Sequence, residues 1–498
     1  MTRPPADGPL LLRCRTLVAD AASAPLADAG VLVDATGTVT RVAPYALLAD
    51  KAPAARTEVL DGVVLPAFTD AHSHLRALPL AEQDVADADL ESWVVRLTGA
   101  TALDPGDDAL VAADGLTATG VTTVQAVHHT FAGPEEYTAS VTAVARELVL
   151  SGLRAQLAVG LTDQAEFSPE TASGTRGTPA APHRGLRPDR LPPLLAGLLR
   201  SAGRWPGVRI ALAPVAPQWC SDEALDALRR CAADGVRLHT HLLESPHQRG
   251  WLADGDDPVA RLDRHRLLGP GTSAAHGVWL TDAETALLAE RGTALVHCPT
   301  SNLRLGSGDA RVRSWLDAGA AVALGLDSQH QGPPDMFAEM RAALAAAERA
   351  GGPLTSREVL AMATEGGAAA TGNTGRLGRI APGHRADLVC VAVPGGIGTD
   401  PVEHVVHEAT HRDVSDVLRA GRWLVGAGVT LRGAEANAAR TRLRAALFAD
   451  RAARARRMAA LAPTEAALRA LLDDTNTRRL PPNDRTERYA RTRDRGEA

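Results

Sequence analysis

Two histidines, His72 and His74, follow the apolar run of residues 62–66 and stand two residues apart. Side chains two apart on a β-strand point the same way, so both imidazoles would lie on one face of a sheet. Such a pair is weak evidence for a metal site, because two polar residues at a strand end can also be bonded to water. The other polar clusters of the chain decide between these two interpretations.

Further histidines and acids stand at the corresponding place, each at the end of a short apolar run. His239 and His241 are again two apart and are followed by Glu244, while His276 and Asp327 each end a run of their own. Chance does not readily place so many of the 16 histidines at strand ends together with two acids. Neutral imidazoles with one carboxylate form a ligand set for Zn²⁺ or Fe²⁺ that leaves one position open for water.

The middle of the chain, residues 61–380, repeats a unit in which a short apolar run is followed by a helical run rich in Ala, Leu and Arg. Repeated strands and helices predict a parallel sheet covered by helices, and seven or eight units predict a closed (β/α)8 barrel of the TIM type. The carboxyl ends of all barrel strands meet at one mouth, where the polar clusters would converge. A doubly wound open sheet is the alternative, but no GxGxxG follows the first strand.

Two β-rich segments flank this middle. Residues 9–45 alternate and turn like β-hairpins, with turn chemistry at residues 35–38, and residues 384–393 and 414–431 are also β-rich. We therefore expect one small discontinuous β-sandwich domain, with residues 1–60 as its first part and residues 381–435 as its second part.

Residues 436–498 are predicted to form a helical extension that ends in a poorly ordered tail, where acids interleave with arginines. The alternative interpretation of this tail is a nucleic-acid-binding arm, but Tyr489 is its only aromatic residue, which makes that interpretation weak.

Residues 166–193, rich in Pro, Gly, Ser and Thr, are expected to form a long loop, either flexible filler or a lid over the site.

The bulk properties narrow the class of protein. A net charge of −6 gives no overall attraction to nucleic acid or anionic membranes. Five widely spaced cysteines without a CxxC indicate reduced thiols, and we find no signal peptide or membrane-spanning stretch. We expect a cytoplasmic protein with a small-molecule substrate, no nucleic-acid or membrane partner, and a homo-oligomeric state, a dimer by default.

Taken together, the motifs resemble those of the amidohydrolase superfamily, in its cytosine deaminase-like and guanine deaminase-like branch. The run VVLPAFTDAHSH is similar to the Pro-Gly-Phe-x-Asp-x-His-x-His signature of that family, with Ala67 in place of the usual glycine. The resemblance extends to about residue 435 and includes GVTTV (120–124), HLLE (241–244), SNLRLGSG (301–308) and GRLGRIAPGHRADLVCV (375–391).

The resemblance also implies roles for the residues of the polar clusters. Four metal ligands are implied: His72, His74, His241 and Asp327. Asp327 would in addition deprotonate the attacking water, Glu244 would shuttle protons, and His276 would orient the attacking hydroxide or the substrate. His239 is not a usual ligand of the family, and we expect it to lie behind the ligands.

Lys51 is the only lysine of the chain. Members of the superfamily with two metals bridge them with a carboxylated lysine from a mid-barrel strand, whereas Lys51 precedes the first metal-binding strand. One divalent metal is therefore expected, unless a Glu or Cys replaces the bridge. Zinc is the expected metal, and iron is the alternative.

The expected activity is hydrolytic deamination of an N-heterocycle or amidine by metal-bound hydroxide, because ammonia departure requires both an activated water and a proton donor. The alternatives are an amidase or triazine-type chlorohydrolase on the same metal site, and a catalytically silent barrel that serves as a binding protein. Substrate contacts are expected on the loops that follow the strands, from Arg76, Gln83, His128, His129, Gln218, Trp219, Cys220 and His330.

Overall fold

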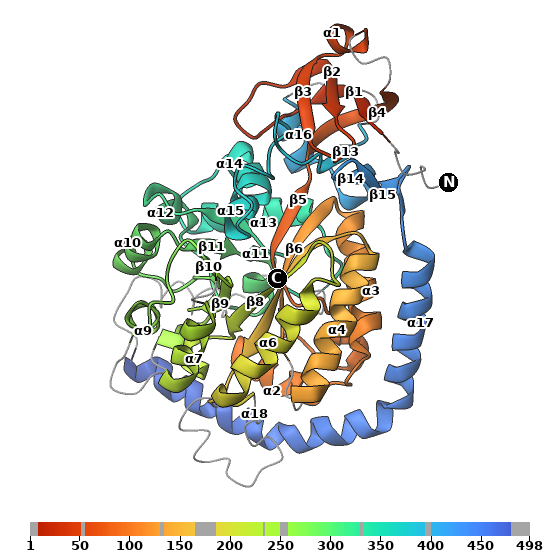
Figure 1. The fold of residues 1–498 in the computed structure, drawn as a ribbon. Coiled ribbons are helices and arrows are strands. Elements are labelled where there is room, and N and C mark those ends of the chain that lie inside the picture. The colour runs from red at the N-terminus through yellow and green to blue at the C-terminus, as the bar shows by residue number, and fades with distance from the viewer. Residues whose placement is uncertain are drawn as a thin grey trace.

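The computed structural model describes residues 8–50, 55–129, 134–164, 186–232, 235–249, 257–328, 332–393 and 400–479. The described strands form two eight-stranded sheets, one of which lies at the centre of the molecule and the other at one end (Figure 1).

The central sheet is a nearly closed barrel whose parallel strands follow one another in chain order. They are β5 (Phe68–Ser73), β6 (Val121–His128), β7 (Arg154–Leu161), β8 (Val208–Pro214), β9 (Leu238–Leu242), β10 (Thr272–His276), β11 (Ala294–His297) and β12 (Val322–Leu324). An isolated parallel bridge between Ser73 and Asp327 joins the two ends of the sheet. The Asp327 amide donates to the His72 carbonyl over 2.8 Å, and the His74 amide donates to the Asp327 carbonyl over 2.9 Å. The predicted TIM-type barrel is confirmed. Its first and last strands meet beside His72, His74 and Asp327, three of the residues with a predicted role in metal binding.

Helices cover the outside of the barrel (Figure 1). The longer ones are α3 (Pro105–Ala118), α4 (Pro134–Leu150), α6 (Leu191–Ala202), α7 (Asp222–Ala232), α10 (Asp282–Arg291) and α13 (Met336–Arg349), and the shorter ones are α9 (Pro258–Arg264), α12 (Val312–Asp317), α14 (Ser356–Ala361) and α15 (Gly367–Ala370). Local sequence sets their ends. For example, α10 begins with a capping box between Thr281 and Glu284 and ends at Gly292, which has a left-handed φ of +73°.

The second sheet is mixed, and it combines both ends of the chain. Its order is β16-β15-β14-β13-β4-β1-β2-β3. The strands are β1 (Leu10–Leu17), β2 (Leu26–Val33), β3 (Val39–Pro44), β4 (Arg56–Pro66), β13 (Leu388–Val391), β14 (Val414–Arg419), β15 (Arg422–Gly426) and β16 (Val429–Thr430). Leu12, Val31 and Leu60 from the first part share one core with Leu388 and Leu418 from the second. The predicted discontinuous β domain is confirmed.

The run of residues 62–74, interpreted from sequence as one barrel strand, divides between the two sheets. Pro66 ends β4 opposite Leu388, and Phe68 begins β5 opposite Val121. Between them the Ala67 amide donates to the Asp387 carbonyl over 3.0 Å. The change of sheet follows from Pro66, which lacks an amide hydrogen for continued pairing.

The C-terminal extension is helical, as predicted. Helix α17 (Gly433–Ala449) runs down the side of the molecule, and α18 (Arg451–Arg479) passes beneath the barrel (Figure 1). Helix α18 packs on α2 (Leu90–Leu97), where Leu461, Leu468 and Leu472 bury Val95. The predicted tail (480–498) and most of the predicted loop (165–185) lie outside the described residues.

All five cysteines lie within the described ranges, are buried, and form no disulfide. No described helix combines the length and the apolar character that crossing a membrane requires.

Candidate metal centre and active site

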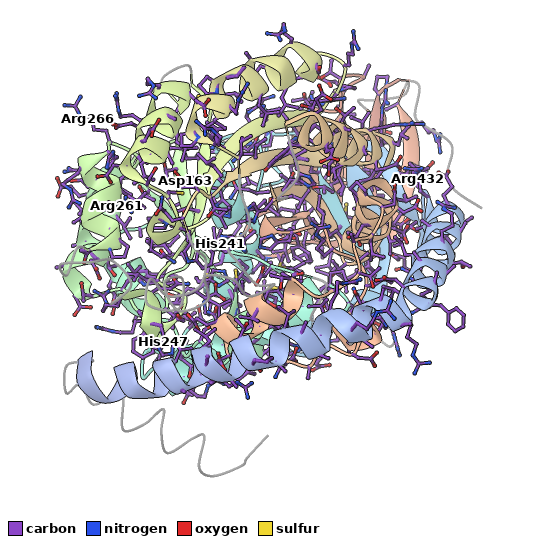
Figure 2. All side chains as sticks on the ribbon, turned by 90° about the horizontal axis from the view of Figure 1, so that it is seen from below. Asp163, His241, His247, Arg261, Arg266 and Arg432 are labelled. Carbon is purple, nitrogen blue, oxygen red and sulfur yellow. The ribbon has the colours of Figure 1, made fainter. Side chains whose placement is uncertain are left out.

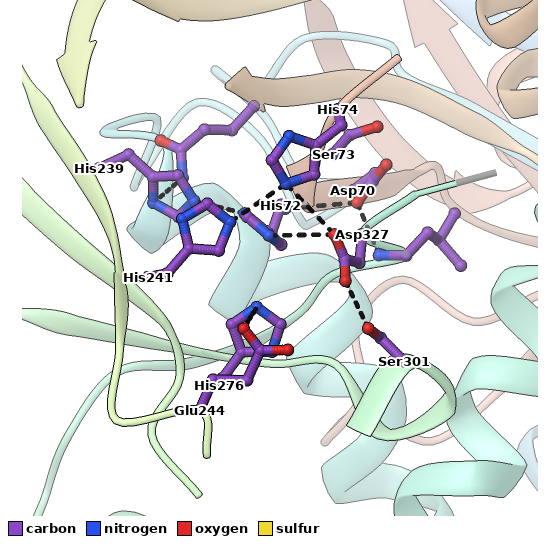
Figure 3. Close-up of polar contacts among 12 residues, drawn as sticks. Asp70, His72, Ser73, His74, His239, His241, Glu244, His276, Ser301 and Asp327 are labelled. Carbon is purple, nitrogen blue, oxygen red and sulfur yellow. Dashed lines mark hydrogen bonds and ion pairs between the residues drawn. The ribbon is translucent and has the colours of Figure 1, made fainter. Parts of the chain in front are cut away.

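Three imidazoles and one carboxylate converge at the point where the barrel closes (Figure 3). Nε2 of His74 lies 3.1 Å from Nε2 of His241, and Oδ1 of Asp327 lies 3.4 Å from Nε2 of both His72 and His74. Ring nitrogens of His72 and His241 lie within 4.8 Å of each other. The structure thus brings together the four residues for which the sequence predicts metal binding.

The backbone around this cluster is held in an unusual conformation. Leu75, Leu243, His276 and Asp327, each just after or at the end of a barrel strand, have positive φ values of 50°, 47°, 72° and 56°. Left-handed backbone is uncommon for residues with a Cβ atom and costs of order 1–3 kcal/mol each. Of these four residues, His276 and Asp327 line the cavity at the mouth of the barrel, whereas Leu75 and Leu243 pack in the main core.

Hydrogen bonds behind the imidazoles determine which ring nitrogen is free. Nδ1 of His241 donates to the Val215 carbonyl over 2.6 Å, so Nε2 keeps its lone pair. Nε2 of His239 lies 2.7 Å from Nδ1 of His72, and Nδ1 of His239 lies 2.8 Å from Ser273 Oγ and 2.9 Å from Nε2 of Gln125. The contact with His239 engages Nδ1 of His72, whereas the buried Nε2 of His72 has no hydrogen-bond partner among the described residues.

These residues fit a divalent metal. Burial lowers the pKa of His72, His74 and His241, so the three imidazoles are neutral at neutral pH, as metal ligation requires. Burial would raise the pKa of Asp327, but His72, whose Nε2 lies 3.4 Å from Oδ1, and the other nearby imidazoles hold it well below its usual value. Three neutral nitrogen donors and one carboxylate are a ligand set for zinc or iron.

A second carboxyl, Glu244, lies beside the cluster (Figure 3). Its Oε2 lies 3.6 Å from Nε2 of His276, and burial raises the pKa of Glu244 to about 7. Nδ1 of His276 donates to Oδ1 of Asn302 over 3.0 Å, so its Nε2 faces Glu244 as an acceptor. Two carboxyls in one site whose pKa values are pushed apart are suited to opposite roles in proton transfer.

Sequence reasoning missed two residues that hold this site in place, Ser301 and Asn302 at the start of α11 (Pro299–Arg304). Ser301 donates to Oδ2 of Asp327, and Asn302 fixes His276. A signal was present, because both residues follow a barrel strand as the other clusters do. Ser and Asn are common where helices begin, however, so their residue types alone indicate no role.

A cavity of about 650 Å³ opens beside the cluster. Five of the predicted substrate contacts line it: Arg76, Gln83, His128, His129 and Trp219. Arg76 lies 3.4 Å from the buried Asp108. Gln218 does not line the cavity; it is 3% exposed, and its amide atoms have no hydrogen-bond partner among the described residues. Cys220 is buried against Leu161, and His330 lies outside the described residues.

One wall of the cavity comes from α2, which sequence reasoning did not assign to the site. Leu90, Trp93, Val94 and Leu97 line the cavity from this helix. Helix α18 holds its outer side (Figure 2), because Arg96 donates to both oxygens of Glu465 over 2.7 and 3.0 Å. The C-terminal extension therefore supports the substrate-facing wall.

Replacement of His239 tests the hydrogen bonds behind the ligands. We expect His239→Ala to weaken metal binding by about 10- to 100-fold, because His72 loses the hydrogen-bond partner that holds its ring in place. Competition with a chromophoric chelator measures this affinity. His297→Ala is the matched control, since His297 is a buried imidazole on β11 without a hydrogen-bond partner among the described residues. Equal metal affinity in His239→Ala and the unchanged chain would contradict the assignment.

Comparison with known proteins agrees with this geometry. The model of the amidohydrolase family matches residues 63–424. The 5-methylthioadenosine/S-adenosylhomocysteine deaminase of Moorella thermoacetica is 32% identical over 386 residues, which cover 74% of this chain and 83% of that protein.

Two solved structures with zinc are similar over most of the chain. An adenosine deaminase from Xanthomonas campestris has a TM-score of 0.71 at 26% identity and covers 89% of this chain and 100% of its own. The atrazine chlorohydrolase of Arthrobacter aurescens has a TM-score of 0.74 at 25% identity and covers 88% of this chain and 100% of its own. The barrel, the converging ligands and these relatives agree: the chain belongs to the amidohydrolase family and is a metal-dependent hydrolase that acts on C–N bonds.

Proposed function

We propose that the chain is a hydrolytic deaminase that releases ammonia from a 6-aminopurine nucleoside or a related N-heterocycle. The observation that carries this proposal is the place of Glu244, a buried carboxyl beside the ligand cluster and on the cavity. A departing nitrogen needs a proton, and a positioned acid contributes about 10²- to 10⁴-fold in rate.

The metal in this proposal is one zinc ion, held by His72, His74, His241 and Asp327. A bound divalent metal supplies a water molecule acidic enough to attack at neutral pH. A two-metal site bridged by lysine would need a lysine in the barrel, and the only lysine is Lys51. Both similar solved structures contain zinc, which supports zinc over iron.

The residues of this chain then divide the proton transfers. Asp327 accepts the proton of the attacking water, because Ser301 fixes its second oxygen and leaves the first toward the imidazoles. Glu244 protonates the ring nitrogen, regains the proton that the water gave to Asp327, and passes it to the departing amine. The proton of the new hydroxyl group, released as the carbonyl forms, restores the acid form of Glu244. His276, whose Nδ1 is held by Asn302, orients the attacking water by accepting a hydrogen bond at Nε2.

The cavity suits an aromatic heterocycle with an apolar arm. Trp93 and Trp219 contribute aromatic side chains to the lining of the cavity, and Leu90, Val94 and Leu97 contribute apolar ones. The Moorella relative is named for methylthioadenosine and S-adenosylhomocysteine, and the Xanthomonas neighbour for adenosine. We therefore propose adenosine and its 5′-thio derivatives as the first substrates.

Ammonia release from the zinc-loaded chain tests this proposal on a panel of adenosine, methylthioadenosine, S-adenosylhomocysteine, cytosine, guanine, a pterin and an aminotriazine. We expect at least one adenosine derivative to react with kcat/KM of about 10⁴ M⁻¹ s⁻¹ or more. No ammonia from any compound would refute deamination. Likeness to the atrazine chlorohydrolase favours a second candidate, which chloride release from a chlorotriazine without ammonia would identify.

A further inference from the structure

A buried contact joins the cavity wall to the turn that carries Glu244. The hydroxyl of Ser245, the residue after Glu244, donates to Oε1 of Glu91 in the first turn of α2. Glu91 and Ser245 are each 3% exposed. The contact spans 154 residues of sequence, so it connects parts of the chain that only the fold brings together.

Burying the carboxyl of Glu91 costs free energy, and the favourable effect of an acid in the first turn of a helix does not account for it. An acid in the first turn stabilises a helix start while it remains in water. Glu91 is instead buried, which raises its pKa to about 7, and burying such a group is unfavourable unless it is hydrogen-bonded. The Ser245 hydroxyl is the partner that compensates for this burial.

The position of Glu244 depends on the backbone of this turn. Its carboxylate lies 3.6 Å from His276, which is longer than a hydrogen bond. The turn is held by the Glu244 amide, which donates to Gln248 Oε1 over 2.8 Å, and by the Leu243 carbonyl, which accepts from Trp279 over 3.1 Å. The Ser245 contact to Glu91 adds the link to α2.

We infer that Glu91 is a positioning residue that acts through Ser245 to hold Glu244 at the substrate. Because Leu90 and Trp93 beside it line the cavity, the same contact couples the substrate-facing wall to the proton-shuttling carboxyl. This inference rests on the role proposed for Glu244.

A double-mutant cycle on the full zinc-loaded chain tests the coupling. Glu91→Ala and Ser245→Ala are each expected to lower kcat by about 10- to 100-fold with little change in KM, because a small misplacement of a catalytic group has effects of this size. The double variant should lose no more than either single variant, since both changes break one contact. Glu91→Gln, which keeps an acceptor, and Ser245→Thr, which keeps the hydroxyl, should retain most of the activity.

Glu465→Ala is the matched control, because it removes the Arg96–Glu465 pair between α2 and α18 and leaves the contact between Ser245 and Glu91 in place. We expect it to raise KM and to leave kcat nearly unchanged. Wild-type kcat in the folded Ser245→Ala chain, additive losses in the double variant, or an equal loss of kcat in Glu465→Ala would each overturn the inference. Full activity in Glu244→Gln would instead refute the proposed function, so the two failures are distinguishable.

Discussion

Replacing Glu244 with glutamine is expected to lower kcat by about a hundred- to ten-thousandfold, the range that a positioned general acid contributes. Glutamine keeps the shape of the side chain but cannot hold and release a proton. The expected loss is large because Glu244 is buried beside His276 and lines the cavity, where the departing nitrogen would need its proton. Steady-state kinetics with the best substrate of the panel measures the loss.

Two further measurements show whether the loss in Glu244→Gln comes from the chemical step rather than from lost metal or lost stability. Metal content and thermal unfolding of Glu244→Gln should match the unchanged chain, because Glu244 is not among the four proposed ligands. Glu284→Gln is the matched control, since Glu284 is a buried carboxyl on α10 that pairs with Arg249 and does not line the cavity. Unchanged kcat in Glu244→Gln would remove the proton-shuttle role.

Replacing His241 with alanine is expected to abolish both metal binding and activity. His241 is fixed through Nδ1 to Val215 and presents Nε2 to the cluster, so its loss removes one of four donors. The effect on affinity should exceed the roughly 10- to 100-fold expected when a partner behind a ligand is removed. Because a ligand that binds only the folded state stabilises it, zinc should raise the melting temperature of the unchanged chain but not of His241→Ala.

His411→Ala serves as the control for this variant, because His411 is half-exposed and pairs with Asp335 away from the cavity. It should retain metal and activity. A catalytically silent binding protein would keep its function in His241→Ala, so loss of ammonia release together with the metal separates the enzyme from that alternative.

The fold and the convergence of the polar clusters could be predicted from one rule, whereas the assignment of the four metal ligands came from the resemblance to the amidohydrolase superfamily. Apolar runs that end in polar residues indicate barrel strands, and a barrel brings all strand ends to one mouth. His72, His241 and Asp327 lie far apart in sequence, yet each stands at the same place in its own unit. No knowledge of side-chain packing was needed to expect them together.

The rest of the site depends on contacts between distant segments. Arg96 and Glu465 are 369 residues apart, and no periodicity in either helix indicates that α18 supports the cavity wall. Gln218 illustrates a second limit. It follows strand β8 as expected, but the short helix Pro217–Trp219 directs its neighbour Trp219 into the cavity instead. A strand end fixes where a residue lies along the barrel, whereas the turn after it fixes where the side chain points.

The central claim is that four side chains hold one metal ion, and the metal content of the purified chain tests it most directly. Inductively coupled plasma mass spectrometry measures this content in the unchanged chain and in His241→Ala, after both are dialysed against metal-free buffer. If His72, His74, His241 and Asp327 hold a single ion, the unchanged chain will contain one zinc per chain and the variant almost none. Two tightly held ions per chain, or one ion that persists in His241→Ala, would contradict it.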